Sequence, residues 1–159
     1  MRIELTVQRD CETAGLPTDA EFQAWVDIAL TDRAQPASLG LRIVDEAESG
    51  ALNQRYRQRA GPTNVLSFAA DVPEPMAREL LAAGVAVPLG DLVLCAPVIR
   101  REAEAQGKGE QAHWAHLTVH GVLHLLGFDH QSQAEAAQME SRETELLARL
   151  GIADPYAPR

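Results

Sequence analysis

The 159-residue sequence contains no long apolar segment, no closely spaced cysteine pair and no excess of positive charge. Its longest apolar run, residues 92–99, is far shorter than the roughly 20 residues that span a bilayer. The start of the chain carries charges at positions 2, 4, 9 and 10, where a signal peptide would have an apolar core. We therefore expect a cytoplasmic protein that does not interact with membranes.

The chain has only two cysteines and a negative net charge, and both facts limit the kinds of binding site it can contain. Cys11 and Cys95 are distant in the sequence and lack the CxxC spacing of a thiolate metal site or a redox pair. Cys95 lies in the apolar run and is expected to be a buried hydrophobic residue. The formal net charge of −9 at pH 7 argues against a protein that binds nucleic acid by bulk electrostatics, because phosphate binding depends on Lys and Arg.

The apolar pattern predicts an α+β fold in a single domain, residues 1–159, which is long enough to bury its own core. Apolar runs and alternations predict strands at residues 2–8, 38–46, 65–69 and 91–96. Helical spacing predicts helices at residues 19–32, 48–57, 97–107, 110–126 and 132–150. The proline-containing residues 71–89 are expected to form a long loop with room for a helical turn at 76–83. This order indicates a small mixed four-stranded sheet packed with about five helices.

Four of the five histidines fall on one face of the predicted central helix, 110–126. They are His113, His116, His120 and His124. The rest of this helix is apolar on nearly every side, which is typical of a buried helix. Buried imidazoles need hydrogen-bond partners or a ligand, because an unsatisfied buried polar group costs about 1–3 kcal/mol.

The spacing of three histidines indicates a metal site. His120 and His124, four residues apart, can bind one ion from adjacent turns. Gly127 can end the helix and let the chain reverse, so that His130 becomes a third ligand. The pattern H-x-x-x-H-x-x-G-x-x-H is the ligand frame of a family of zinc proteases, and three imidazoles leave a fourth position for water, as in catalytic zinc sites.

A simpler interpretation exists for each histidine taken alone. His120 and His124 would then be core residues bonded to backbone or carboxylates, and His130 a solvated turn residue. The combined spacing favours the metal site for these three. For His113 and His116 the simpler interpretation is preferred: we expect helix histidines with satisfied hydrogen bonds. The alternative is that they support the metal site or face RNA.

Gly121 stands where the protease frame requires a glutamate as general base. A glycine cannot transfer a proton, so peptide hydrolysis is disfavoured unless another residue supplies the base. Glycine also costs a helix about 1 kcal/mol relative to alanine. We therefore expect that close packing requires it at this position.

Two segments together resemble the YbeY family of bacterial metal-dependent endoribonucleases. They are AHWAHLTVHGVLHLLGFDH at residues 112–130 and LNQRYRQRAGPTNVLSF at residues 52–68. The resemblance implies the family's α+β fold and a role in rRNA maturation and ribosome quality control. It also implies that His120, His124 and His130 bind zinc and that Arg57 is the functional arginine of a Tyr-Arg pair.

The chain departs from the family pattern after Arg57. The family usually has a Gly-Lys-Asp-like triplet there, whereas this chain has Gln58, Arg59 and Ala60. Arg59 retains the positive charge, but Ala60 removes a carboxylate, so any role of that carboxylate is in doubt here.

These residues predict a zinc-dependent cleavage of single-stranded RNA. Zinc would lower the pKa of a bound water toward about 7, and the hydroxide or a ribose 2′-OH would attack the phosphorus. Arg57 would hold the phosphate in a bidentate contact and stabilise the developing charge. Arg59, Asn64 and Ser67 are expected to line the RNA-binding groove, with an ordinary strand residue as the equal alternative for Ser67. Asp129 would either orient an imidazole or be a simple turn residue. The general base is not identified, and other transition metals also suit imidazole ligands.

The acidic net charge limits this hypothesis. Much of the acid lies in residues 45–48 and in the last helix, at Glu135, Glu140, Glu143 and Glu145, which are distant in sequence from the expected cleft. We expect modest, salt-sensitive RNA affinity, with ribosomal particles and ribosome-associated proteins as partners that direct the enzyme. Two alternatives stay open: a zincin-like metalloprotease or other hydrolase, and a non-catalytic ribosome assembly factor stabilised by its metal.

Overall fold

A four-stranded mixed sheet organises the fold, which is described here from a computed structural model covering residues 3–129 and 131–157. The strands are β1 (Ile3–Asp10), β2 (Ala37–Val44), β3 (Val65–Ala69) and β4 (Val87–Cys95). The helices are α1 (Asp19–Ala29), α2 (Glu46–Arg57), α3 (Glu74–Ala82), α4 (Ala96–Ala105), α5 (Glu110–Leu125) and α6 (Gln133–Arg149). The strand order is β1-β2-β4-β3, with β1, β2 and β4 parallel and β3 antiparallel to β4. The predicted α+β class and mixed four-stranded sheet are confirmed.

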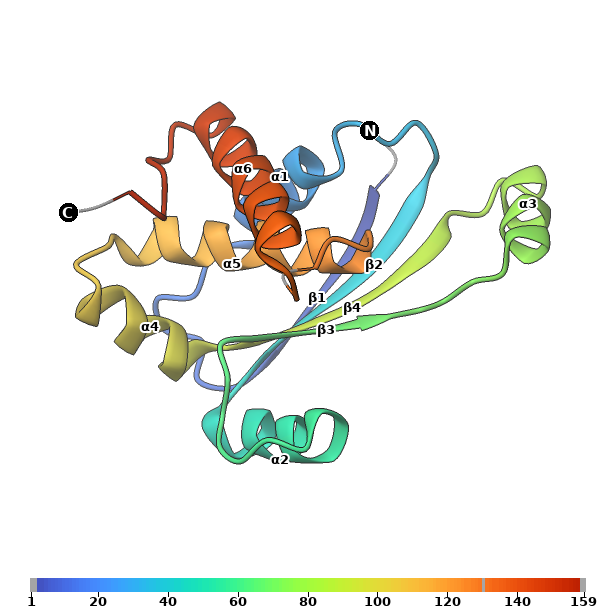
Figure 1. The fold of residues 1–159 in the computed structure, drawn as a ribbon. Helices are drawn as coiled ribbons and strands as arrows, with labels where there is room; N and C mark the ends of the chain where they lie inside the picture. The colour runs from blue at the N-terminus through green and yellow to red at the C-terminus, as the bar shows by residue number, and fades with distance from the viewer. Residues whose placement is uncertain (1–2, 130, 158–159) are drawn as a thin grey trace.

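The helices are divided unequally between the two faces of the sheet. Helices α1, α4, α5 and α6 lie on one side, and α2 lies on the other (Figure 1). Helix α5 contacts β3, β4, α1, α4 and α6, so it is the central helix that its apolar composition predicted. Side chains near its middle therefore have fixed surroundings, which is what a site with defined geometry needs.

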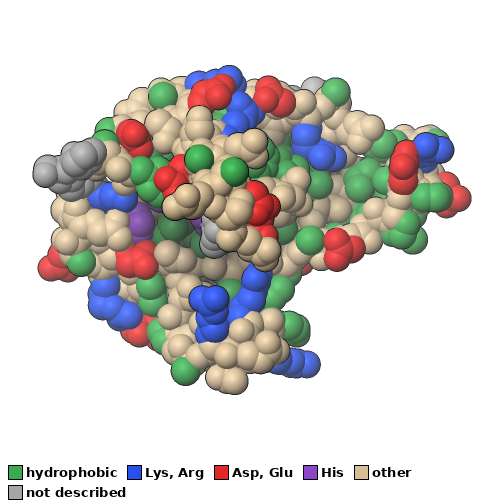
Figure 2. Space-filling view, in the orientation of Figure 1, with side chains coloured by type: hydrophobic (Ala, Val, Ile, Leu, Met, Phe, Trp, Pro, Cys, Tyr) green, Lys and Arg blue, Asp and Glu red, His purple; other side chains and the backbone are tan. Residues whose placement is uncertain are grey.

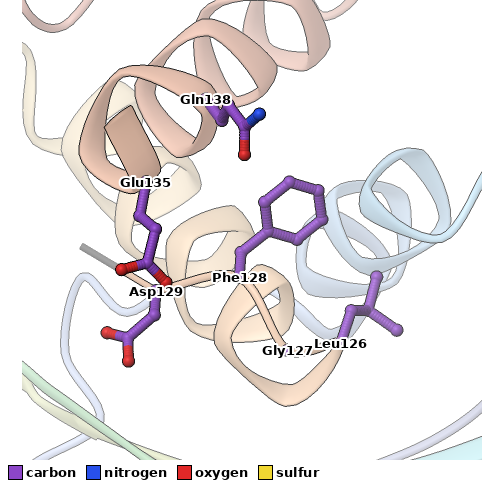
Figure 3. A pocket seen from close by; sticks show the side chains of 6 residues that line it. All are labelled: Leu126, Gly127, Phe128, Asp129, Glu135 and Gln138. Carbon is purple, nitrogen blue, oxygen red and sulfur yellow. The ribbon is translucent and has the colours of Figure 1, made fainter. Parts of the chain in front are cut away.

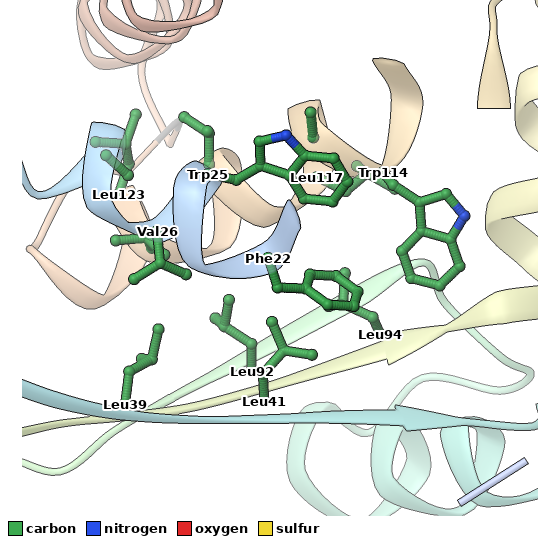
Figure 4. Packing of buried hydrophobic residues seen from close by; sticks show 14 of the residues in the cluster. Phe22, Trp25, Val26, Leu39, Leu41, Leu92, Leu94, Trp114, Leu117 and Leu123 are labelled. Carbon is green, nitrogen blue, oxygen red and sulfur yellow. The ribbon is translucent and has the colours of Figure 1, made fainter. Parts of the chain in front are cut away.

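The main core lies between α1, α5 and the sheet (Figure 4). Phe22 of α1 is fully buried and makes edge contacts with Trp25, at a ring separation of 5.4 Å, and with Trp114 of α5, at 5.9 Å. Such aromatic pairs add about 0.5–1.5 kcal/mol beyond the area they bury. Cys95 at the end of β4 is also fully buried, as its apolar surroundings predicted. This packing holds α5 against the sheet.

The prediction of a long loop over residues 71–89 with a helical turn at 76–83 placed a helical element correctly but underestimated the regular structure. The segment contains the nine-residue helix α3, and β4 begins at Val87. Its prolines suggested a loop, but Pro75 lies in the first turn of α3, where proline is tolerated. Pro88 pairs with Ser38 beside a register shift between β2 and β4, which accommodates the missing N–H. Every residue of α3 is at least partly exposed, and the helix lies at the far end of the extended β3–β4 pair (Figure 1).

Among the described residues, no helix combines the length and the apolar character needed to cross a membrane.

Candidate active site

A cavity of about 830 Å³ lies between the C-terminal end of α2, strand β3 and helix α5. Basic side chains over the α2 region border the hollow in the middle of Figure 2. The cavity brings together seven of the predicted site residues, from segments up to about 70 residues apart. They are Arg57, Arg59, Asn64, Ser67, His120, His124 and Asp129. The eighth, His130, lies outside the described residues.

The two half-buried imidazoles at the cavity converge. Nε2 of His120 and Nε2 of His124 are 3.1 Å apart, as successive turns of α5 allow. Two imidazole nitrogens that bind one tetrahedral zinc ion at 2.0–2.1 Å are about 3.3 Å apart. The spacing of this pair therefore fits shared coordination of a metal ion, with nitrogens of the type that zinc prefers.

Helix α5 ends in a turn that only glycine adopts easily. Gly127 has a φ of +99°, and its N–H donates to the carbonyl of His124 at 3.0 Å. The N–H of Phe128 donates to the carbonyl of Leu123 at 3.0 Å. These two bonds form a Schellman motif, which reverses the chain directly after the histidine pair. The side chains of Phe128 and Asp129 point in different directions, and Asp129 lies beside Glu135 of α6 (Figure 3).

Gly121 faces the sheet, and the packing expected from the sequence is present. A Cβ at this position would lie 2.8 Å from Leu92 Cδ2 and 3.2 Å from Val65 Cγ2. The hydroxyl of Ser67 on β3 donates to the Gly121 carbonyl at 3.0 Å. Helix α5 therefore approaches β3 and β4 too closely for a larger side chain. The glutamate of the zinc proteases would point into this packed layer.

The exposed Arg57 lies at the end of α2, on the rim of the cavity. Its Nη2 donates to the carbonyl of Ser67 at 3.0 Å, which ties the arginine to β3. The segment after it is held by the buried Asn53, whose Nδ2 donates to the Gly61 carbonyl at 2.9 Å. A guanidinium has five N–H donors, so this contact orients Arg57 and leaves donors for a phosphate. Arg59 lines the same cavity.

Asn64 and Ser67 make structural hydrogen bonds at the positions where the sequence predicted RNA contacts. Asn64 Nδ2 donates to the Glu102 carboxylate at 3.0 Å, and its Oδ1 accepts from the N–H of Val65 at 2.6 Å. These bonds fix the start of β3. Ser67, bonded to Gly121, fixes the distance between β3 and α5. Both residues thus help shape the cavity wall, whatever else they bind.

His113 and His116 are buried, and Nε2 of each contacts a carboxylate, whereas Nδ1 of each has no hydrogen-bond partner among the described residues. The expectation of satisfied helix histidines therefore holds for one nitrogen of each ring. His113 Nε2 lies 2.9 Å from Glu102 Oε1, and His116 Nε2 lies 2.8 Å from Glu143 Oε2. Burial opposes ionisation of Glu102, but its bonds with His113 and Asn64 lower the pKa of its carboxyl overall. Burial lowers the pKa of His116 and so favours the neutral ring.

Glu143, on the inner face of α6, is the functional candidate that sequence reasoning missed. Its side chain is fully buried, and its Oε1 lies 2.5 Å from His120 Nδ1. Its Oε2 accepts from the Tyr156 hydroxyl at 2.5 Å and also contacts His116. Burial alone would raise the pKa of this carboxyl, but the contacts with His116, His120 and Tyr156 lower it to about 2. Glu143 is therefore an ionised carboxylate inside the protein.

Glu143 is distant from the cleft in the sequence, as noted above, but the fold brings it into contact with His120. The residue shares the buried face of α6 with Met139, Leu146 and Leu147, at helical spacings of four, three and four residues. An acidic residue in such an apolar stripe indicates a buried partner. The sequence argument overlooked this position because it treated all the acidic residues of α6 as one exposed group.

Two groups among the described residues have metal-binding geometry, and they share His120. The first is His120 with His124. The second is His116, His120 and Glu143, whose ligand atoms lie within 4.8 Å of one another and could hold a metal ion. In the second group, however, the carboxylate already contacts both rings at hydrogen-bond distance, so an ion would have to replace these bonds. The first group faces the cavity.

The structure thus combines an α+β fold with residues that could bind a metal ion. The model of the family Endoribonuclease YbeY matches residues 7–151, and the chain belongs to this family. The predicted family and the enzyme class, a hydrolase acting on RNA, are thereby confirmed.

Relatives named Endoribonuclease YbeY match nearly the whole chain. One from Stenotrophomonas maltophilia (strain R551-3) is 52% identical over 158 residues, which cover 99% of this chain and 95% of the relative. One from Pseudomonas putida (strain W619) is 53% identical over 156 residues, covering 98% and 94%. The solution structure of TM1509 from Thermotoga maritima is 19% identical with a TM-score of 0.56, covering 96% of this chain and all of that one. The last likeness supports the fold.

Proposed function

We propose that the protein is a zinc-dependent endoribonuclease that hydrolyses single-stranded RNA in the cytoplasm, with ribosomal RNA as its target. The observation that carries this proposal is the convergence of His120 and His124 at 3.1 Å in a cavity whose rim holds Arg57 and Arg59. Membership of an endoribonuclease family supports RNA as the substrate. In this proposal the enzyme acts in rRNA maturation and ribosome quality control.

His120, His124 and His130 are the proposed zinc ligands. Zinc, when bound, supplies a Lewis acid that lowers the pKa of a coordinated water toward about 7. The protein's part is to hold two Nε2 atoms close together on one helix and to reverse the chain at Gly127. Asp129 lines the same cavity and is proposed to orient an imidazole.

Arg57 and Arg59 are the proposed phosphate-binding residues. Arg57 is already held by its hydrogen bond to the Ser67 carbonyl. It can therefore present its remaining donors to two phosphate oxygens with little further loss of side-chain entropy. Two guanidinium groups beside the histidine pair also supply local positive charge in a chain whose net charge is −9. They would stabilise the charge that develops on the phosphate during cleavage.

The acidic body of the protein makes RNA affinity dependent on this small basic rim. Affinity for free RNA should accordingly be modest and salt-sensitive. Ribosomal particles and ribosome-associated proteins are proposed to bring the enzyme to its substrate. Asn64 and Ser67 are proposed to contact the RNA from the cavity wall, with the atoms that their structural bonds leave available.

A protease function has less support. The position of the protease base is Gly121, and the layer that a side chain there would enter is filled by Leu92 and Val65. The same zinc ligands can therefore be present without the glutamate that activates water for peptide hydrolysis.

The test compares zinc-loaded protein on single-stranded RNA and on unfolded casein, with and without a chelator. The variants are His124→Ala, Arg57→Ala and, as a matched control, Arg55→Ala, whose guanidinium stacks 5.3 Å from the Tyr56 ring centre. We expect RNA cleavage that the chelator, His124→Ala and Arg57→Ala abolish and that Arg55→Ala retains. Cleavage of casein with intact RNA would overturn the proposal. Intact substrates with a chelator-dependent melting temperature would favour a non-catalytic assembly factor instead.

A further inference from the structure

We propose that Glu143 is a positioning residue that holds His120 in the orientation and tautomer needed to present Nε2 to the metal. This inference rests on the proposed metal centre and assigns a role to a residue of α6 that lies 23 positions beyond His120 in the sequence. Glu143 itself does not line the cavity, but it contacts His120, which does. It acts through the ring of His120.

The proton positions follow from the chemistry of the two groups. An ionised carboxylate only accepts hydrogen bonds, so in the 2.5 Å contact with Glu143 Oε1 the proton belongs to Nδ1 of His120. A neutral imidazole with its proton on Nδ1 has a lone pair on Nε2. That atom is the one 3.1 Å from His124 Nε2. A carboxylate behind a metal-binding histidine commonly fixes the tautomer and the ring direction in this way.

Tyr156, from the segment after α6, keeps the carboxylate from turning. Its hydroxyl donates to Glu143 Oε2 at 2.5 Å, and His116 Nε2 contacts the same oxygen at 2.8 Å. With Oε2 engaged by two neighbours, Oε1 is directed at His120. The full burial of Glu143 makes each of these contacts stronger than it would be in water.

A purely structural role for Glu143, joining α5 to α6, would affect stability but not the geometry of a bound metal. The experiment therefore measures metal binding in the full-length protein. Zn²⁺ affinity is determined by competition with a chromogenic chelator, and the visible spectrum is recorded after saturation with Co²⁺. The variants are Glu143→Gln and the control Glu140→Gln, an exposed residue one turn earlier on α6.

We expect Glu143→Gln to weaken Zn²⁺ binding about 10–100-fold, the usual effect of removing a group that supports a metal ligand, and to change the Co²⁺ spectrum. Glu140→Gln should leave both unchanged. Tyr156→Phe removes only a hydroxyl and replaces Glu143→Gln as the test variant if the latter does not fold. It should weaken Zn²⁺ binding by a smaller factor and still unfold in one cooperative thermal transition. The inference would be overturned if the folded Glu143→Gln protein had an unchanged Zn²⁺ affinity and an unchanged Co²⁺ spectrum. The same result in Tyr156→Phe would overturn it if only that variant folds.

The outcome is separable from that of the proposed function. If the wild type binds zinc and Glu143→Gln binds it more weakly, but neither cleaves RNA, the positioning role stands and the nuclease proposal fails. If the wild type cleaves RNA and Glu143→Gln binds zinc with the same affinity and spectrum, the nuclease proposal stands and the positioning role fails.

Discussion

The two histidine pairs of α5 share one helix face but have different partners. In the N-terminal pair, the Nε2 atoms of His113 and His116 are each taken by a buried or partly buried carboxylate. In the C-terminal pair, His120 and His124 direct Nε2 at one another beside the cavity. The carboxylate that reaches His120 contacts the opposite nitrogen, Nδ1. The nitrogen that a neighbouring carboxylate occupies therefore decides whether a histidine here joins a hydrogen-bond network or can bind a metal.

The largest expected effect comes from breaking the C-terminal pair. His124→Ala should weaken Zn²⁺ binding by far more than 100-fold, because loss of a ligand exceeds the roughly 10–100-fold cost of losing a supporting group. His113→Ala is the matched variant from the other pair and should change zinc affinity little. Equilibrium dialysis with zinc measures both. Equal losses in the two variants would show that the pairs do not differ as described.

The buried carboxylate should make the metal-free protein sensitive to acid. The folded pKa of Glu143 is about 2 and its usual value is 4.5, so the unfolded chain takes up this proton first as the pH falls. The ionised group stabilises the fold above about pH 4.5, and about 3 kcal/mol of that stability is lost as the pH falls toward 2. Urea unfolding with chelator present, from pH 7 to pH 3, should show this loss beginning below about pH 5.

In Glu143→Gln the pH dependence over the same range should be flatter, because the titrating group is absent. Glu140→Gln again provides the control and should follow the wild type. An identical slope in wild type and Glu143→Gln would mean that Glu143 does not carry the buried charge.

The opposite face of α5 can be tested through its glycine. Gly121→Ala should destabilise the protein by up to about 2 kcal/mol, since overpacking against Leu92 and Val65 costs about 1–3 kcal/mol and the gain in helix propensity returns about 1. Gly50→Ala in α2 is the control, because its nearest contacts to a Cβ are 3.6 Å or longer. It should stabilise the protein by about 0.5–1 kcal/mol. Thermal unfolding measures both, and a stabilised Gly121→Ala protein would refute the close approach.

The smallest expected effect concerns the basic rim. Each phosphate neutralised on a single strand contributes about −0.7 to the slope of log affinity against log salt concentration. Arg59→Ala should therefore make this slope less negative by about 0.7 and weaken binding of different RNA sequences alike. Fluorescence anisotropy at several salt concentrations measures it. An unchanged slope would remove Arg59 from the phosphate contacts.

The parts of the fold that sequence could predict are those set by local pattern. Strand β3, at Val65–Ala69, occupies the predicted residues, and α5 ends at Leu125, within one residue of the expectation. The alternation of apolar residues and the glycine at 127 determine these elements locally. The length of helix α3 was underestimated, as a turn at 76–83, because its prolines suggested a loop, although a proline in the first helical turn leaves no intrahelical bond unmade.

The candidate site was predictable where its residues are close in the sequence. His120 and His124 belong to one helix, so their spacing alone predicts convergence. Glu143 and Tyr156 reach His120 and His116 only through the packing of α6 and the segment after it. Local sequence pattern contains no record of such contacts between distant segments. His130 lies outside the described residues, so its role as a third ligand stays a prediction.

The most direct test is to locate the metal by anomalous X-ray scattering at the zinc edge in crystals of the zinc-loaded protein. The account predicts one ion within about 2.0–2.1 Å of Nε2 of both His120 and His124, with Glu143 still bonded to Nδ1 of His120. An ion bound instead between His116 and the Glu143 carboxylate, or the absence of an ion at the histidine pair, would contradict it.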